Sequence, residues 1–171
     1  KIENELINPI TVSQTISSDI DIRTYIEGKT REEAESVKDD ITNRLLSIGN
    51  EFDYKMVFVV SDKTRAYYTY NGISKYLDVE NDSHDIWYKD YLDSGKRYTV
   101  NVDTDEDNNW SLSVFINYGI IDTNGDILGA CGVGVDMNDL VDIFAGFEEE
   151  YNIKVYLVNH DGLIQVDTDV S

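Results

Sequence analysis

Apolar residues recur at every third or fourth position in the first part of the chain. The clearest stripe consists of Ala34, Val37, Ile41, Leu45 and Ile48. This spacing places successive apolar side chains on one face of a helix, so it predicts a helix with a buried face. Thr30 and Glu33 have the spacing of a capping box at its start, and Gly49-Asn50 predicts its end. A looser stripe from Ile2 to Ile26 predicts further helix before it.

From Tyr54 onward the pattern becomes that of β-strands. Short runs rich in β-branched and aromatic residues, separated by polar turns, are typical of a sheet. Three such runs are Lys55–Val60, Ala66–Tyr70 and Arg97–Asp103. Between the last two, the segment Ser83–Ser94 predicts a short helix capped by Ser83, with aromatic residues on or near one side: Trp87, Tyr88 and Tyr91.

The segment from Trp110 to Met137 predicts a β-hairpin. Two apolar runs flank Asn124-Gly125, a dipeptide suited to a two-residue turn in which both central residues have positive φ. Glycines cluster in the second run, and glycines inside a strand indicate close approach of a backbone or a ligand. A helical pattern follows, from Asn138 to Tyr151.

The last part of the chain repeats an earlier pattern. Lys154–Asp167 predicts a strand, a turn and a strand, and Val155–Val158 resembles Val57–Val60 in this respect. Such a repeat is expected if residues 151–171 are the first strands of a second module that resembles the first.

Composition excludes some classes of protein. With 171 residues and 41% hydrophobic residues, the chain is long enough for a globular domain. Its formal net charge is −20, which argues against a nucleic-acid partner because phosphate binding needs a basic surface. The single cysteine, Cys131, lies in an apolar run and is expected to be a small buried residue. No continuous apolar run reaches the length of about 18 residues that would predict a membrane span.

Four segments together resemble the Cache family of PAS-like extracytoplasmic sensor domains. They are VFVVSDK from Val57, HDIWYKDYLDSG from His84, FINYGIIDTNGDILGACGVGVDM from Phe115 and KVYLVNHDGLIQVD from Lys154. The resemblance implies an α+β fold in which a long N-terminal helix packs on a mainly antiparallel sheet of about five strands. It divides the chain into an N-terminal signalling or dimer helix (1–50), a membrane-distal module (51–150) and the start of a second, truncated module (151–171).

The resemblance also implies a function in signalling. We expect the extracytoplasmic sensor of a bacterial membrane protein, with a diguanylate cyclase (GGDEF) output, and with no enzymatic activity or cofactor in the sensor itself. Flanking transmembrane helices are then expected outside this sequence, and a homodimer contact through the N-terminal helix. The alternatives are the sensor of a histidine kinase or chemoreceptor, a structural spacer, and an enzyme whose catalytic residues the sequence does not reveal.

Ligand-binding residues follow from the same resemblance. Amino-acid-sensing members grip the ligand carboxylate with Arg-x-Trp-Tyr and hold its ammonium group with two aspartates. Here Trp87-Tyr88 is retained, Asp85 occupies the arginine position, Asp103 fits the first aspartate, and Asp136 follows the second by two residues. Asn101 shares a strand face with Asp103, and Tyr118 is a further candidate contact. This set predicts a cationic or neutral ligand, not an α-amino acid; packing and capping are the competing interpretation.

Other chemistry is weakly indicated. Asp103, Asp105 and Asp107 have the spacing of a calcium loop, but Asn108 and Val114 replace the glycine and glutamate that the loop requires. His84, His160 and Cys131 lack the paired spacing of a zinc site. We therefore expect no metal and no catalytic residue.

Overall fold

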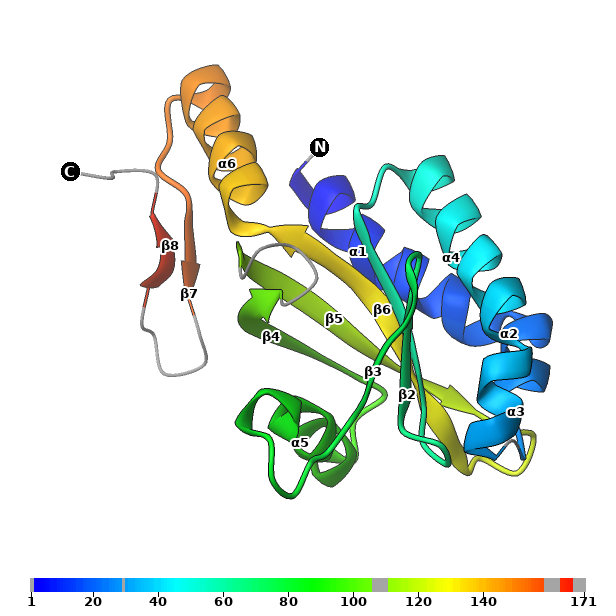
Figure 1. Ribbon diagram of the computed structural model, residues 1–171. Helices are drawn as coiled ribbons and strands as arrows, with labels where there is room; N and C mark the ends of the chain where they lie inside the picture. The colour runs from blue at the N-terminus through cyan, green and yellow to red at the C-terminus, as the bar shows by residue number, and fades with distance from the viewer. Residues whose placement is uncertain (1, 29, 106–110, 159–163, 168–171) are drawn as a thin grey trace.

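A six-stranded antiparallel sheet with strand order β3-β2-β1-β6-β5-β4 lies at the centre of the computed structural model (Figure 1). The structure describes residues 2–28, 30–105, 111–158 and 164–167. The strands of this sheet are β1 (Met56–Ser61), β2 (Ala66–Thr69), β3 (Gly72–Tyr76), β4 (Tyr98–Asp105), β5 (Ser111–Ile121) and β6 (Ile127–Asp136). Strands β7 (Tyr156–Val158) and β8 (Ile164–Asp167) pair with each other in a separate two-stranded sheet.

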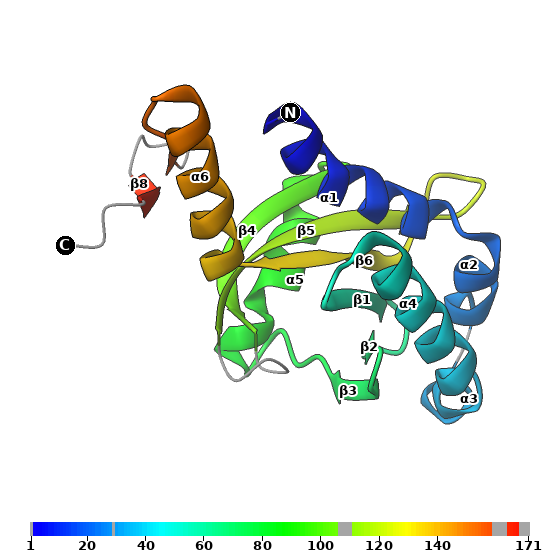
Figure 2. The same cartoon turned by 90° about the horizontal axis from the view of Figure 1, so that it is seen from above.

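Helices cover both faces of the sheet unequally. The helical segments are α1 (Ile2–Ser18), α2 (Ile20–Ile26), α3 (Arg31–Ser36), α4 (Lys38–Phe52), the 3₁₀ turn η1 (Ser83–Asp85), α5 (Ile86–Ser94) and α6 (Met137–Tyr151). Helices α1, α2 and α4 lie on one face and α5 lies on the other (Figure 2). Helix α6 packs at the end of β5 and β6, next to β8.

Alternation along the strands decides which side chains meet the helices. On β1, Val57 and Val59 point toward the N-terminal helices and contribute to the core there, whereas Phe58 and Val60 belong to a second cluster beneath α5. Cys131 on β6 is buried in the first cluster, as expected, and its thiol donates a 3.4 Å hydrogen bond to the carbonyl of Ser13. One face of the sheet is therefore covered by the N-terminal helices, and the opposite face packs against α5 and has room beside it for a site.

This architecture confirms the predicted α+β class and the helical region packed on an antiparallel sheet, with two differences in detail. The sheet has six strands because β3 forms between β2 and η1, where the sequence pattern predicts no strand. The N-terminal region is four helices, α1 to α4, and not one long helix.

The boundary between α3 and α4 falls inside the predicted apolar stripe. The capping box is present: the Thr30 hydroxyl accepts a hydrogen bond from the Glu33 N–H, and the Thr30 N–H donates to the Glu33 carboxylate. Val37 then leaves the helical conformation, with φ −104° and ψ 1°, and separates α3 from α4. Helix α4 ends at Phe52, beyond the predicted Gly49-Asn50, because Asp53 adopts the left-handed conformation that terminates it.

The turn between β5 and β6 is longer than the two residues expected. Residues 122–126 form the loop, and the Asp122 carboxylate accepts hydrogen bonds from the backbone N–H groups of Asn124 and Asp126. Within this loop only Gly125 has positive φ, at 94°. The aspartate side chain thus replaces backbone geometry in organising the turn.

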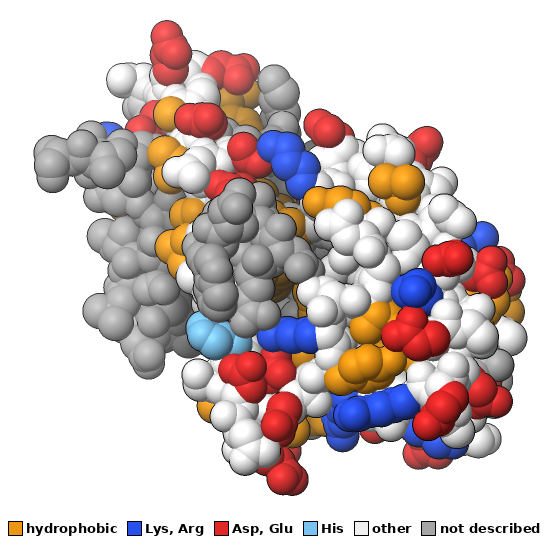
Figure 3. Space-filling view, viewed as in Figure 1, with side chains coloured by type: hydrophobic (Ala, Val, Ile, Leu, Met, Phe, Trp, Pro, Cys, Tyr) orange, Lys and Arg blue, Asp and Glu red, His pale blue; other side chains and the backbone are white. Residues whose placement is uncertain are grey.

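Acidic side chains are spread widely over the molecular face in Figure 3, with lysines and arginines among them. One arginine links two of the N-terminal helices. Arg44 on α4 forms ion pairs of 2.7 Å with Asp19 and 3.0 Å with Asp21, at the start of α2. The pairs are partly exposed, so they orient the helices more than they stabilise the fold.

Glycines in β6 allow its neighbours to approach closely. A Cβ atom on Gly132 would lie 1.7 Å from the carbonyl oxygen of Ile116, and one on Gly129 would lie 1.9 Å from that of Val60. These distances are far inside van der Waals contact, and both obstacles are backbone atoms that cannot move aside without displacing a strand. The glycine cluster therefore reflects close backbone approach within the sheet.

We predict that Gly132→Ala lowers the free energy of unfolding by about 3 kcal/mol or more, because the methyl group forces β5 away from β6. Gly146→Ala is the matched control: this residue of α6 is exposed, and no atom lies within 4 Å of the position that an added methyl group would occupy. Alanine there should stabilise the domain by about 0.5–1 kcal/mol. Urea unfolding measures both; equal effects of the two substitutions would contradict the packing described for β6.

Candidate functional site

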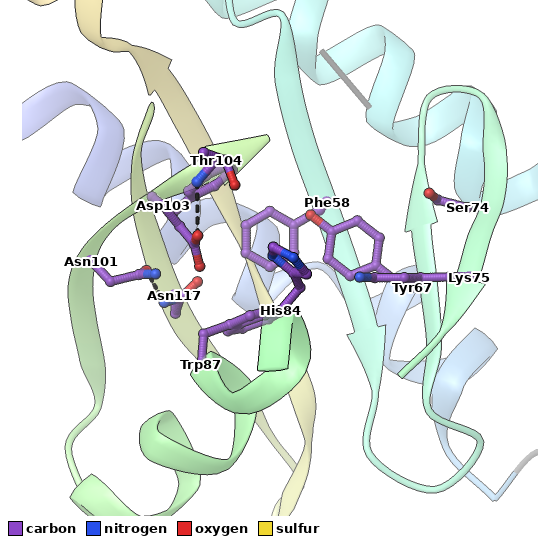
Figure 4. Close-up of a pocket in the computed structure, with 11 residues that line it drawn as sticks. Phe58, Tyr67, Ser74, Lys75, His84, Trp87, Asn101, Asp103, Thr104 and Asn117 are labelled. Atoms are coloured by element: carbon purple, nitrogen blue, oxygen red, sulfur yellow. Dashed lines mark hydrogen bonds between the residues drawn. The ribbon is translucent and has the colours of Figure 1, made fainter. Parts of the chain in front are cut away.

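A cavity opens on the face of the sheet opposite the N-terminal helices, between β4 and β5 on one side and β2 and β3 on the other (Figure 4). The enclosed part of this cavity measures about 50 Å³, and the empty space that it shares with open solvent is about 500 Å³. The side chains that line it are Phe58, Tyr67, Ser74, Lys75, His84, Trp87, Asn101, Asp103, Thr104, Phe115 and Asn117.

Aromatic rings form the apolar part of this cavity. Phe58 and Tyr67 stack with their centroids 5.4 Å apart and an interplanar angle of 7°. The Trp87 ring meets Phe58 edge-on at 5.8 Å and Tyr67 edge-on at 6.3 Å. The rings support one another from three elements, β1, β2 and α5, so their positions are fixed before any ligand binds.

Polar groups from β4 and β5 face these rings. The Asn117 amide donates a 2.7 Å hydrogen bond to the Asn101 side-chain oxygen, and the Asp103 carboxylate accepts one of 2.8 Å from the Thr104 N–H. Strand alternation brings Asn101 and Asp103 to the same face, as the sequence predicts. Asp103 makes no ion pair with any residue that the structure describes.

A lysine and an aspartate form an ion pair at the edge of the cavity. Lys75 on β3 places its ammonium nitrogen 2.7 Å from a carboxylate oxygen of Asp85, whose side chain is 2% exposed. The other carboxylate oxygen accepts a 2.7 Å hydrogen bond from the Asp78 N–H. This pair joins β3, the connection after it and the turn η1, which carries His84 and leads into α5 with Trp87.

The structure brings three of the seven candidate ligand contacts to the cavity: Trp87, Asn101 and Asp103. Asp85, predicted as a ligand contact, is absent from the residues that line the cavity, and its carboxylate pairs with Lys75. The cap of this helical segment also differs from the prediction. Asp82, and not Ser83, accepts the hydrogen bond from the His84 N–H.

Tyr88 does not share the cavity with Trp87. Successive residues of a helix point about 100° apart, so the burial of Tyr88 turns Trp87 toward the cavity. The Tyr88 hydroxyl donates a 2.9 Å hydrogen bond to the Asp62 carboxylate, and the Arg65 guanidinium lies 5.2 Å from its ring centroid. Tyr88 is therefore a buried anchor that holds α5 against the sheet.

Tyr118 and Asp136 also lie away from the cavity. Tyr118 is on the helix-facing side of β5, one residue out of step with Asn117, where it stacks on Tyr98 at 5.8 Å. Asp136 is the N-cap of α6 and accepts a 2.8 Å hydrogen bond from the Asn138 N–H. Tyr118 lies on the opposite face of β5 from the cavity because side chains alternate along a strand, and Asp136 is held at the start of α6 by its capping role. Neither residue lines the cavity with Trp87, Asn101 and Asp103.

Sequence reasoning missed most of the remaining cavity wall. Phe58 and Tyr67 were assigned to strands, but their common face depends on the pairing of β1 with β2. Lys75 was missed because β3 was not predicted. The alternation of Ile73 with Lys75 after the turn at Asn71-Gly72 is the signal that could have indicated this strand.

The arrangement can bind a small polar molecule but has no evident metal site. Within the part of the chain that the structure describes, no three His, Cys, Asp or Glu side chains gather closely enough to hold a metal ion. The cavity instead combines ring faces, amides and one carboxylate without a cationic partner among the described residues.

No protein-family model matches the sequence. Solved structures match the fold. One is the E. coli DcuS sensor domain, with a TM-score of 0.58 and 11% identity, covering 79% of this chain and 90% of that one. Another is the ligand-binding domain of the Campylobacter jejuni chemoreceptor Tlp3 in complex with 4-methylisoleucine. Its TM-score is 0.64 and its identity 14%, and the match covers 98% of this chain and 64% of that one. A third is the sensor domain of the V. cholerae histidine kinase DctB. Its TM-score is 0.60 and its identity 16%, and the match covers 82% of this chain and 52% of that one.

These structures confirm the predicted fold: the chain has the PAS-like fold of the Cache-type sensor domains. The matched proteins are described as sensor or ligand-binding domains. It spans less than two thirds of the Tlp3 and DctB domains, 64% and 52% of their lengths. Among the described residues, every helix is too short or too polar to cross a lipid bilayer.

The buried phenol of Tyr88 yields a prediction for alkaline pH. Burial raises the pKa of Tyr88, and the neighbouring Asp62 carboxylate raises it further. The folded state then keeps a proton that the unfolded chain loses above about pH 10, so the free energy of unfolding falls as the pH rises beyond that value, by up to ~1.4 kcal/mol per pH unit.

We expect Tyr88→Phe to reduce this alkaline slope, although at pH 7 it costs about 1–3 kcal/mol because the hydrogen bond to Asp62 is lost. Urea unfolding at neutral pH and at a series of values above about pH 10 measures both effects. Parallel declines in the variant and the unsubstituted domain would show that Tyr88 does not hold its proton in the folded state.

Proposed function

We propose that this chain is the extracytoplasmic ligand-sensing domain of a membrane-bound signalling receptor, and that its cavity binds a small molecule bearing an ammonium group. The observation that carries this proposal is Asp103, a carboxylate without a cationic partner among the described residues, facing a wall of aromatic rings that includes Trp87. An ammonium group can contact a carboxylate and ring faces at the same time.

The charges around the cavity support a cationic or neutral ligand over an anion. The Lys75–Asp85 pair contributes one charge of each sign, so the described side chains leave the carboxylate of Asp103 unbalanced. Asn101, Asn117 and the aromatic rings are uncharged. A ligand with a net negative charge would be repelled by Asp103.

The comparisons support a small-molecule ligand. The Tlp3 domain, whose fold is similar, was solved in complex with 4-methylisoleucine, an amino acid that carries both an ammonium group and a carboxylate. Because the sequence identity is below 25%, the ligand of Tlp3 does not identify the ligand of this chain. The proposed ligand class therefore rests on the side chains that line this cavity. The cavity beside Trp87 also favours a sensing role over the structural-spacer alternative, for which a filled sheet face was expected.

Signal transfer is proposed to run through the N-terminal helices. Helices α1 and α4 pack directly on the sheet that holds the cavity, so closure around a ligand would shift them as a unit.

We further propose that residues 1–50 form a homodimer contact and that β7 and β8 begin a second module. A diguanylate cyclase output is the one we favour from the sequence; the similarity to DctB and Tlp3 keeps a histidine kinase and a chemoreceptor as alternatives.

Isothermal titration with amines, amino acids and organic acids tests the ligand class. We expect amines to bind preferentially, and Asp103→Asn to weaken the best amine by about 2 kcal/mol or more because a charge-assisted contact is lost. Trp87→Ala should weaken the same ligand, whereas Trp87→Phe should retain part of the affinity because a ring face remains.

The matched control is Asp93→Asn, which removes an exposed carboxylate of α5 that pairs only with Lys89 among the described residues. It should leave ligand affinity unchanged. The proposal fails if a dicarboxylate or an amino acid binds tightly and neither Asp103→Asn nor Trp87→Ala alters that affinity.

A further inference from the structure

Asn117 is a buried amide in the cavity wall whose hydrogen-bond donors are all used within the sheet. The residue is 2% exposed and lies on the cavity face of β5. Its amide nitrogen donates a 2.7 Å hydrogen bond to the Asn101 side-chain oxygen and a longer one, of 3.5 Å, to the Thr99 hydroxyl oxygen. An asparagine amide has two N–H hydrogens, so both are directed at β4.

The side-chain oxygen of Asn117 is left for the cavity. Among the described residues, no donor reaches this oxygen. Figure 4 shows the nitrogen of Asn117 turned toward Asn101 and the oxygen on the side of the cavity. Rotation of this amide alone would bring its oxygen against the oxygen of Asn101, so the 2.7 Å hydrogen bond holds the acceptor in place.

An acceptor held in this way discriminates between ligands. A buried carbonyl oxygen without a donor carries a desolvation cost, which a ligand relieves if it brings an N–H or O–H group to that point. A ligand group that can only accept a hydrogen bond gains nothing there. The Asn117 oxygen therefore favours donors over acceptors of similar shape.

The Asn117 oxygen and the Asp103 carboxylate are separate contact points. Asp103 pairs with Ser113 and Asn117 pairs with Thr99 in the register of β4 and β5. Positions 99 and 103 are four residues apart, a separation of about 13 Å along a strand. A ligand that contacts both groups must therefore carry its ammonium group and its second donor at opposite ends of a short chain.

We infer that Asn117 is a second ligand contact, which selects amines that carry a further hydrogen-bond donor at the end away from the ammonium group. Amino alcohols are the simplest members of this class. The inference rests on the proposed amine site at Asp103, and it adds the specificity-determining residue at the other end of the ligand.

A matched series of ligands tests the inference by isothermal titration: amino alcohols with unbranched chains of three to six carbon atoms, and the methyl ether of each. The ether keeps the oxygen as an acceptor but cannot donate. In the unsubstituted domain, the amino alcohol of best length should bind about tenfold more tightly than its ether, which corresponds to one hydrogen bond.

Two substitutions separate the acceptor from the shape of the wall. Asn117→Leu removes the acceptor and has a similar size, so it should bring the alcohol and its ether to within about twofold of each other. Asn117→Asp retains an acceptor and should retain the preference; because both ligands carry the same charge, the added carboxylate cancels from the ratio. Thermal unfolding establishes that each variant is folded, and the ratio in the unsubstituted domain remains decisive if the leucine variant does not fold.

The outcomes distinguish this inference from the proposed function. Failure of every amine to bind, or amine binding that Asp103→Asn leaves intact, overturns the amine site and the inference with it. Amine binding that Asp103→Asn weakens, without a preference for the alcohol over its ether, overturns the inference alone.

The two variants at position 117 complete the test. A preference that Asn117→Leu retains is a steric effect of the added methyl group, and one that both variants lose shows that Asn117 only shapes the wall; either result overturns the inference. A preference present in the unsubstituted domain and in Asn117→Asp, and absent in Asn117→Leu, supports it.

Discussion

The burial of one face of the central sheet beneath the N-terminal helices is the constraint on which the rest of the structure depends. It turns Val57, Val59, Cys131 and Tyr118 toward α1, α2 and α4. Alternation then leaves the neighbouring residues of the same strands, among them Phe58 and Asn117, on the opposite face. A shift of one residue in any strand would exchange core and cavity side chains, so packing on the helix side keeps the site in register.

The electrostatics of the cavity follow from that arrangement. Although the formal net charge of the chain is −20, few charged groups among the described residues lie around this cavity, and the most deeply buried of them, Asp85, pairs with Lys75. Asp103 lies where no described cation balances it. The contrast separates the two carboxylates: Asp85 holds β3 and η1 together, and Asp103 is the one that we propose faces the ligand.

The sequence predicted the features that depend on local pattern. The capping box at Thr30, the buried Cys131 and the common face of Asn101 and Asp103 all follow from spacing along the chain. Other features depend on contacts between distant segments. The loop between β5 and β6 is set by the Asp122 side chain, and the Lys75–Asp85 pair requires β3 to lie beside η1. The Trp-Tyr motif predicted two cavity residues, but only Trp87 lines the cavity and Tyr88 is a buried anchor, because a motif does not specify which side of α5 is buried.

Nuclear magnetic resonance of the ¹⁵N-labelled domain during titration with butylamine tests the central claim most directly, because it locates the ligand without a substitution. The account predicts saturable shifts of the Trp87 indole N–H and of the Asn101 and Asn117 side-chain amides, which lie in or beside the cavity. Backbone amides of Ile16 and Ile41, in the core on the other face of the sheet, should shift far less. Shifts confined to the helix side, or no saturable change at Trp87, would contradict the assignment of this cavity as the ligand site.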